Sequence, residues 1–322
     1  MRAGDFRLTS RAIMFSAHPV PVTTAMSGGA ELSPAIGRVT IVIPAHNEEA
    51  AIGNVLEALR AGVPSTVREI IVVDDGSSDR TGEIARAAGA RVLTQPSNRG
   101  YGAALKAGIR ASSSDYVLTM DADGQHRVED VIKLCNAVCR DVPADCVIGH
   151  RTKLMHSPLW RMPGKWFLTQ LARLLTNREI RDLNSGLRVL RRDVIERYMH
   201  LCPSGFSFST TSTFALASRG YRVEFVPILV ERRVGTSTVS VATGFQTILL
   251  ILRLASLFNP LRIFLPLALL FILGGAAWTI PYLLAGRGVT VLAMLSVLTG
   301  VLLFGLGLIC DQVAQLRLER FE

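Results

Sequence analysis

The sequence predicts an α/β domain with a Rossmann-like, mainly parallel sheet, followed by an interfacial helix and a hairpin of two transmembrane helices. Two observations support this class. From Arg38 onward, short β-branched runs alternate with helical patterns, which is typical of βαβ units. The 322 residues are 49% hydrophobic with a mean hydropathy of +0.34, and much of this apolar excess falls in residues 261–310. The composition excludes disordered, collagen-like and disulfide-scaffold proteins.

The α/β domain is expected over residues 38–240. A flexible N-terminal tail, residues 1–37, precedes it and lacks the apolar core of a signal peptide. The run VTIVIPA at 39–45 is typical of a buried strand, and NEEAAIGNVLEALRAG follows with helical spacing. By the same criteria, further strands are predicted at 69–75, 91–96, 115–120 and 221–230, and helices at 79–89, 101–112 and 160–176.

The C-terminal part is predicted to lie on and in a membrane. Residues 241–260 are expected to form a juxtamembrane amphipathic helix, with the helical pattern clearest at 243–258. Residues 261–285 and 289–310 are almost uncharged and long enough to span a bilayer, with a turn at 286–288. The outer flanks carry Arg253, Arg262, Arg317 and Arg320, so the positive-inside tendency places the α/β domain and the tail at 311–322 in the cytoplasm.

The charge distribution favours a membrane surface over nucleic acid as a partner. The formal net charge is +9, from 35 Lys and Arg against 26 Asp and Glu. Arginines gather between Arg219 and Arg262, just before the apolar segments, which suits an anionic lipid surface. The five cysteines form no metal-ligand pattern, which indicates small buried hydrophobic residues in a reducing compartment.

Acidic loops follow three of the predicted strands: PAHNEE, DDGSSD and DADGQH. The carboxyl ends of parallel strands meet at one edge of a sheet, where such sheets bind ligands. Asp121 and Asp123 can converge on one hard cation with Gln125 as a further oxygen ligand, which suits Mg²⁺ or Mn²⁺. A solvated turn is the alternative for so short a motif.

Two further acids lie at the end of the strand predicted at 69–75. The carboxylates of Asp74 and Asp75 are placed to accept hydrogen bonds from a nucleobase N–H or from ribose hydroxyls. Asp79 comes four residues later and is better interpreted as a residue that caps the following helix.

Together and in this order, the motifs PAHNEE, VVDDGSSDRT, NRGYGAALKAG, DADGQH, NSGLRVLRR and RRVGTS resemble a family-2 glycosyltransferase of GT-A fold. The likeness covers about residues 38–240 and is strongest to polyprenol-phosphate (dolichol-phosphate-type) mannosyl- and glucosyltransferases. Part of that family has a C-terminal two-helix membrane hairpin, and such relatives can assemble as homo-oligomers. The resemblance implies inverting transfer of mannose or glucose from a GDP- or UDP-sugar to a polyprenyl or dolichyl phosphate at the cytoplasmic face of the cell membrane.

The resemblance also assigns roles to individual residues. A phosphate acceptor is already ionised near neutral pH, so the reaction does not require a strong base, and Asp182 is expected only to orient the site. The other assignments are Pro44, Glu48 and Asp75 for the nucleoside, Asp121, Asp123 and Gln125 for the metal and diphosphate, Arg232 for the diphosphate, and Arg188, with Arg151 as a second candidate, for the acceptor phosphate.

Some positions depart from the family pattern. Thr236 and Thr238 stand where relatives usually have lysine. How the diphosphate is bound and which sugar is transferred are therefore left undecided by the resemblance. The sequence lacks the Q-x-x-R-W signature of processive polysaccharide synthases and the G-x-G-x-x-G loop of dehydrogenases, and a nucleotidyltransferase would need a basic glycine-rich loop in place of PAHNEE. Two alternatives stay open: a different lipid or polysaccharide acceptor, and an inactive membrane scaffold, against which the intact DADGQ motif argues.

Overall fold

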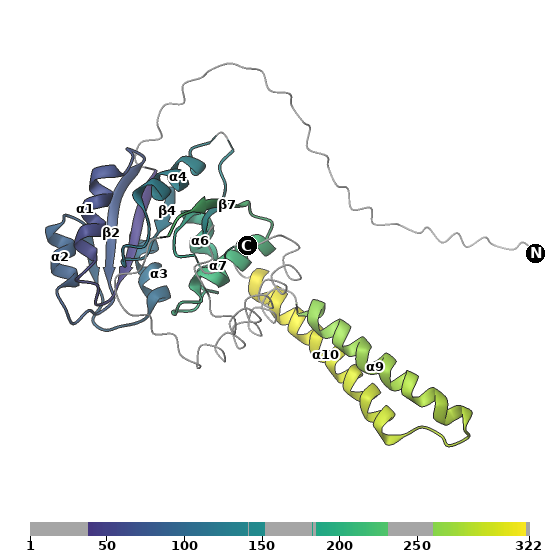
Figure 1. Ribbon diagram of the computed structural model, residues 1–322. Coiled ribbons are helices and arrows are strands. Elements are labelled where there is room, and N and C mark those ends of the chain that lie inside the picture. Colours follow the sequence, from purple (N-terminus) through teal and green to yellow (C-terminus); the bar gives the residue numbers. More distant parts are fainter. Residues whose placement is uncertain (1–37, 141, 152–181, 183–184, 231–259, 320–322) are drawn as a thin grey trace, which may run out of the picture. The chain divides into compact units, whose positions relative to one another are not determined.

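The computed structural model describes residues 38–140, 142–151, 182, 185–230 and 260–319. Its α/β part is built on a seven-stranded sheet with the order β3-β2-β1-β4-β6-β5-β7 (Figure 1). The strands are β1 Val39–Ala45, β2 Val67–Asp74, β3 Arg91–Thr94, β4 Tyr116–Thr119, β5 Cys146–Arg151, β6 Arg188–Arg191 and β7 Val223–Ile228. The helices are α1 Ile52–Gly62, α2 Thr81–Ala87, α3 Tyr101–Ala111, α4 Val128–Val138, α6 Arg192–Tyr198, α7 Phe208–Ser218, α9 Leu261–Leu284 and α10 Val291–Glu319.

The strand pairing confirms the predicted, mainly parallel sheet. β1 lies between β2 and β4 and is parallel to both, β2 is parallel to β3, and β5 is parallel to β7. β6 alone among the described strands runs antiparallel to its neighbours, β4 and β5. The sequence did not predict β5 or β6, because both are short and β6 begins and ends with arginine, which hides the apolar pattern.

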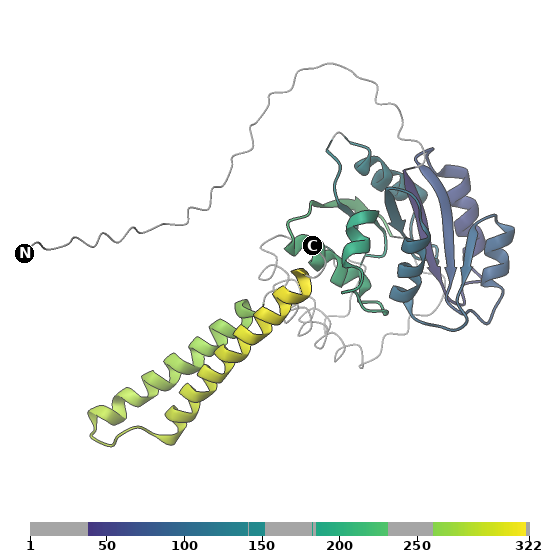
Figure 2. The same cartoon turned by 180° about the vertical axis from the view of Figure 1, so that it is seen from behind.

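Helices cover both faces of the sheet (Figure 1 and Figure 2). Successive side chains of a strand point to opposite faces, so Val42 joins one apolar cluster while Ile41 and Ile43 join the other. The first cluster takes side chains from α3, α6 and α7, and the second from α1, α2 and α4. Because the sheet is buried on both sides, β1 is apolar at nearly every position, which is what made it recognisable in the sequence.

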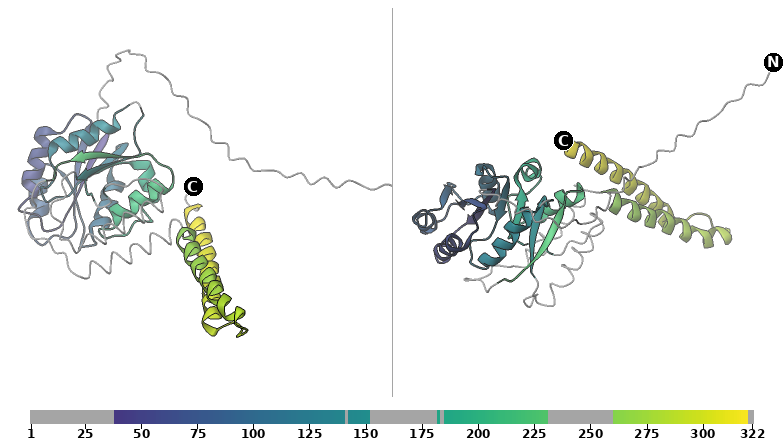
Figure 3. Two further views of the ribbon diagram at one scale, coloured as in Figure 1. Left: turned by 45° about the vertical axis from the view of Figure 1, so that its right-hand side comes forward. Right: turned by 90° about the horizontal axis from the view of Figure 1, so that it is seen from above.

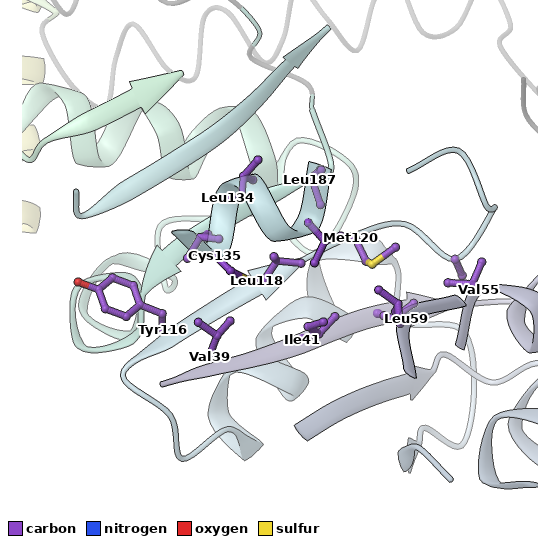
Figure 4. Close-up of a cluster of buried hydrophobic side chains, with 14 of the residues drawn as sticks. Val39, Ile41, Val55, Leu59, Tyr116, Leu118, Met120, Leu134, Cys135 and Leu187 are labelled. Carbon is purple, nitrogen blue, oxygen red and sulfur yellow. The ribbon is translucent and has the colours of Figure 1, made fainter. Parts of the chain in front are cut away.

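The second cluster packs α1 and α4 against one face of the sheet (Figure 4). Val55 and Leu59 of α1 and Leu134 and Cys135 of α4 are at most 7% exposed. Burial of a side chain such as Leu59 contributes about 1.5–3 kcal/mol relative to exposure. Burial also raises the pKa of the Cys135 thiol to about 12, so this cysteine is protonated and serves as a small hydrophobic residue, as predicted.

The helices α9 and α10 form an antiparallel pair that is long and apolar enough to cross a membrane (Figure 3). Small residues let the two backbones approach closely, as is typical of membrane helices. A Cβ atom at Gly300 would lie 2.5 Å from Ile272 and 2.8 Å from the carbonyl oxygen of Ala268. Outward-facing leucines such as Leu270 and Leu284 are 67% and 85% exposed, which suits contact with lipid rather than a soluble core.

The predicted hairpin is confirmed with one change in its length. The turn lies where expected, with Gly286 and Gly288 in the left-handed region at φ 67° and 72°. α10 continues to Glu319, beyond the predicted end of the second span at residue 310, and so includes the start of the predicted tail. The predicted N-terminal tail and the helices predicted at 160–176 and 243–258 lie outside the described residues.

Candidate active site

The polar loops after β1, β2 and β4 lie at one edge of the sheet, as the sequence predicts. In the parallel register, Ala45 at the end of β1 pairs with Asp74 at the end of β2, and Val42 pairs with Thr119 at the end of β4. The three strands therefore end on the same side, which is the side where doubly wound sheets bind ligands.

The loop after β1 is fastened to the loop after β2. Asn47 adopts a left-handed φ of 55°, which asparagine tolerates better than most residues. Its side-chain oxygen accepts a hydrogen bond from the Ser78 N–H at 2.9 Å, and its own N–H donates to the Ser77 hydroxyl at 3.1 Å. The Glu48 N–H donates to the Thr81 hydroxyl at 2.9 Å. The backbone around Glu48, a predicted nucleoside residue, is thus fixed by the start of α2.

Asp79 hydrogen-bonds to the start of α2, as expected of a capping residue, although the N-cap position itself is Arg80. It lies one position before the N-cap residue Arg80, and its carboxylate accepts hydrogen bonds from the Thr81 N–H at 3.0 Å and from the Glu49 N–H at 3.1 Å. Burial alone would raise the pKa of Asp79, but these hydrogen bonds and that from the Thr81 hydroxyl lower it below its usual value.

Asp74 and Asp75 are both buried at this edge, 6% and 3% exposed. The Asp74 carboxylate accepts a hydrogen bond from the Ser77 N–H at 3.0 Å. The two oxygens of Asp75 accept hydrogen bonds from the N–H groups of Arg99 and Gly100, both at 2.8 Å. A carboxylate oxygen has two acceptor directions, so Asp75 has acceptor capacity beyond these bonds. Its contact with a nucleoside stays a prediction. Pro44, another predicted nucleoside residue, lies in β1 opposite Val73.

The first aspartate of DADGQH is held from three sides. The Tyr101 hydroxyl, at the start of α3, donates to Asp121 Oδ1 at 3.0 Å, and His126 Nε2 lies 3.6 Å from Asp121 Oδ2. On a third side, a Cβ atom at Gly186 would come 2.3 Å from the carboxylate. Burial alone would raise the pKa of Asp121, but His126, Tyr101 and the charge of Arg188 lower it below its usual value. Asp121 is therefore ionised at neutral pH, as a metal ligand must be.

One short segment joins the two acidic loops. Arg99 and Gly100 donate to Asp75, and the next residue, Tyr101, donates to Asp121. Burial, followed by the charge of Asp121, raises the pKa of the Tyr101 hydroxyl well above its usual value, so it stays protonated and remains a donor. The spacing of the predicted nucleoside carboxylate and the predicted metal carboxylate is thus fixed by three consecutive residues.

The rest of the DADGQH loop fits a divalent cation. Asp123 is 7% exposed, and its Oδ1 accepts a hydrogen bond from the Gln125 N–H at 3.1 Å. Within the part of the chain that the structure describes, no group of three or more His, Cys, Asp or Glu residues gathers as a complete metal site. The carboxylates of Asp121 and Asp123 with the amide oxygen of Gln125 suit Mg²⁺ or Mn²⁺, which binds one or two protein carboxylates and takes its other ligands from substrate phosphates and water.

Arg151 and Asp182, 31 positions apart, form a bidentate pair. Arg151 Nε lies 2.8 Å from Asp182 Oδ2, and Nη2 lies 3.0 Å from Oδ1. The hydrogen bond to Asp182 and the nearby charge of Asp121 raise the pKa of Arg151. We predicted separate roles for these residues, an acceptor-binding arginine and an orienting acid. The structure brings them together, with the Arg151 side chain 47% exposed.

The position of Arg188 differs from the expectation. It was predicted to reach the acceptor phosphate, but its side chain is fully buried, with 0% exposure. Its guanidinium donates to the carbonyl oxygens of Ser185 and Ser209 and to the hydroxyl of Thr213. In β6 this side chain points into the interior of the domain, where oxygen atoms of α7 accept hydrogen bonds from its guanidinium. Arg188 therefore ties the 185–187 segment to α7 and adds positive charge near Asp121.

Three residues that hold Asp121 were not singled out from the sequence: Tyr101, His126 and Gly186. All three lie inside recognised motifs, NRGYG, DADGQH and NSGLR. Their motif positions are visible in the sequence, but their convergence on one carboxylate depends on the order of the strands. Arg232, the predicted diphosphate arginine, lies outside the described residues.

A mainly parallel α/β sheet with an Asp-x-Asp loop at its ligand edge is the arrangement of GT-A glycosyltransferases, and two family models match accordingly. Residues 40–199 match glycosyl transferase family 2, and residues 259–316 match the GtrB C-terminal hairpin. The chain belongs to glycosyl transferase family 2.

Named relatives support this assignment. The chain is 35% identical over 219 residues to an undecaprenyl-phosphate mannosyltransferase of Micrococcus luteus, covering 63% of this chain and 88% of the relative. It is 32% identical over 208 residues to a dolichyl-phosphate hexose transferase of Haloferax volcanii, covering 64% and 88%. An undecaprenyl-phosphate 4-deoxy-4-formamido-L-arabinose transferase of Pseudomonas paraeruginosa is 30% identical over 308 residues, covering 87% and 86%.

A solved structure supports the fold. Glucosyl-3-phosphoglycerate synthase from Mycobacterium tuberculosis, crystallised with Mn²⁺, uridine diphosphate and glucosyl-3-phosphoglycerate, is similar with a TM-score of 0.57. It is 23% identical in sequence, and the likeness covers 73% of this chain and 86% of that one. At this level of identity the comparison shows a shared fold.

Proposed function

We propose that this glycosyltransferase transfers a hexose from a nucleotide-sugar to a polyprenyl phosphate, with inversion at the anomeric carbon and with Mg²⁺ or Mn²⁺. The observation that carries the proposal is the Asp121–Asp123 pair at the ligand edge of the sheet, in which Asp121 is ionised and Asp123 is buried. Residues 99–101 join this pair to Asp75. The M. luteus and H. volcanii relatives, whose names specify undecaprenyl and dolichyl phosphates, support the acceptor class.

In the proposed reaction, an oxygen of the acceptor phosphate attacks the anomeric carbon, and the bond to the nucleoside diphosphate breaks with its electron pair on the diphosphate. Asp121, Asp123 and Gln125 would hold the cation, which when bound neutralises charge on the leaving diphosphate. Asp75 and Glu48 would orient the nucleoside. Since the phosphate acceptor is already ionised, no residue has to remove a proton from it.

Arg151 is proposed to attract the acceptor phosphate. Its side chain is 47% exposed, and Asp182 fixes the plane of its guanidinium through two hydrogen bonds. A fixed planar arginine binds phosphate oxygens well because its N–H groups match their spacing. Arg188, being buried, is proposed to position Asp121 and α7 rather than to touch the acceptor.

We further propose that the α/β domain lies in the cytoplasm and that the α9–α10 hairpin anchors it in the cell membrane. Arg262 at the start of α9 supports this orientation by the positive-inside tendency. The nucleotide-sugar would then enter from the cytosol, and the lipid phosphate would come from the inner leaflet.

The direct test is transfer by the purified full chain in detergent, with a panel of UDP- and GDP-sugars, a polyprenyl phosphate, and either Mn²⁺ or a chelator. We expect transfer with one donor, and its loss with the chelator or with Asp123→Asn. Asp79→Asn, which alters a helix-capping carboxylate at the same edge, is the matched control and should retain the metal requirement. Transfer in metal-free buffer would contradict the metal assignment.

Homo-oligomer formation is a further proposal, which follows from the resemblance described above and from the match of residues 259–316 to the GtrB C-terminal hairpin. A second candidate function, transfer to a different lipid or polysaccharide, would be favoured if the same panel gave donor hydrolysis without transfer to polyprenyl phosphate.

A further inference from the structure

Phe206 is the most exposed large apolar side chain in the described part of the α/β domain. It is 84% exposed, compared with 65% for Val142 and 43% for Leu229. Single exposed apolar residues are common on protein surfaces, so exposure alone assigns no role. The contacts of this ring distinguish it from the other two residues.

The Phe206 ring is held in place rather than loosely attached. It stacks on the Tyr101 ring with 5.4 Å between centroids and 20° between planes. Its loop is bound to α3, because the Ala103 N–H donates to the Ser204 carbonyl at 3.1 Å and Lys106 Nζ donates to the Cys202 carbonyl at 2.6 Å. One face of the ring is thus covered by Tyr101, while most of its surface is open to solvent.

This ring lies next to the proposed reaction centre. The hydroxyl of the tyrosine under it donates to Asp121 Oδ1 at 3.0 Å. Phe206 is therefore one stacked ring away from the Asp-x-Asp loop. A phenylalanine has no polar atom in its side chain, so what it offers a ligand at this place is apolar contact.

We propose that Phe206 binds the isoprenoid segment next to the acceptor phosphate. This inference rests on the proposed function. An acceptor whose phosphate reaches the metal-bound donor must place its first isoprene units close to the Asp-x-Asp loop. These units are apolar on every side and gain from contact with an aromatic face, whereas a hexose carries hydroxyl groups that need polar partners.

The test uses the full chain in detergent and two acceptors: a long polyprenyl phosphate and a water-soluble prenyl phosphate of two isoprene units. Phe206→Ala should raise the KM for both acceptors about tenfold, equivalent to about 1.4 kcal/mol. The KM for the nucleotide-sugar should change less than twofold, and Phe206→Leu should restore part of the acceptor affinity. Val142→Ala is the matched control for an exposed apolar residue and should leave both acceptor KM values unchanged.

Each other result would overturn the inference in a recognisable way. A raised KM for the donor alone would assign the ring to the sugar. A raised KM for the long acceptor alone, measured in phosphatidylglycerol vesicles, with the KM of the short acceptor unchanged, would assign the Phe206 ring to contact with the membrane. Unchanged kinetics would remove any ligand role. If the unaltered protein uses neither prenyl phosphate, the proposed function itself fails, whatever the variants do.

Discussion

At the residue scale, Asp121 depends on its neighbours. Tyr101 donates to one oxygen, His126 lies against the other, and Gly186 leaves room for the carboxylate. Residues that orient a metal ligand change the affinity for the metal without touching it, because a carboxylate that points the wrong way coordinates the ion poorly. Asp121 therefore acts as part of a group drawn from three loops.

Tyr101→Phe tests this dependence by removing one hydroxyl while keeping the ring. We expect Mn²⁺ affinity in the presence of nucleoside diphosphate to fall about tenfold, as is usual when a residue behind a metal ligand is lost. Electron paramagnetic resonance of free Mn²⁺ measures this directly. Tyr221→Phe removes a hydroxyl from a tyrosine that packs against Tyr198, away from the acidic loops, and should bind Mn²⁺ normally. Equal affinities in the two variants would contradict the role of Tyr101.

At the scale of secondary-structure elements, the start of α3 is shaped by the loop that packs on it. A Cβ atom at Gly102 would lie 2.3 Å from the Pro203 carbonyl oxygen and 2.9 Å from that of Gly205. Gly102, the second glycine of the NRGYG motif, is therefore needed for the close approach of the two backbones. This contact also positions the loop that carries Phe206.

Gly102→Ala is expected to destabilise the protein despite the better helix propensity of alanine. The propensity gain is about 1 kcal/mol, but a backbone oxygen at 2.3 Å has to move, and overpacking of this kind costs about 1–3 kcal/mol. The loop would also shift and weaken the support of Tyr101. A lower melting temperature in detergent, with reduced transfer, is the expected result. Gly205→Ala is the control, since nothing lies within 4 Å of its Cβ position.

The hairpin offers a second paired test of close packing. Gly300→Val places two methyl groups against Ile272 and the Ala268 carbonyl, whereas Gly305→Val extends into open space. We expect only the change at Gly300 to separate α9 from α10, seen as faster proteolysis of the hairpin in detergent. Equal proteolysis of the two variants would show that the small residues are not what holds the helices together.

At the scale of the whole molecule, the proposed orientation places the α9–α10 turn outside the cytoplasm. Arg287→Cys introduces a thiol into this turn between Gly286 and Gly288. A membrane-impermeant maleimide added to intact cells should label this variant, because the turn faces the reagent. The native Cys146 should not react even after lysis without denaturant, since it is buried and burial raises its pKa to about 12. Labelling of Arg287→Cys only after lysis would reverse the orientation.

The sequence predicted the parts of the fold whose pattern is local. β1 and α9 were recognisable because nearly every residue in them is apolar, and the Asp-x-Asp loop because its position follows a strand. The antiparallel β6 and the burial of Arg188 were not predictable in this way. A four-residue strand has no clear period, and whether an arginine faces solvent depends on α7, which lies about twenty residues away in the chain and supplies the oxygens that bind it.

The segment Arg99–Tyr101, with one end on Asp75 and the other on Asp121, has a thermodynamic consequence. A ligand bound at Asp75 acts on the same backbone that places the Tyr101 hydroxyl on Asp121, so binding at the two carboxylates is coupled. Linkage is reciprocal: if nucleoside raises the affinity for the cation by some factor, the cation raises the affinity for nucleoside by the same factor. Donor and metal would therefore enter as a cooperative pair, and an empty enzyme would hold either one weakly.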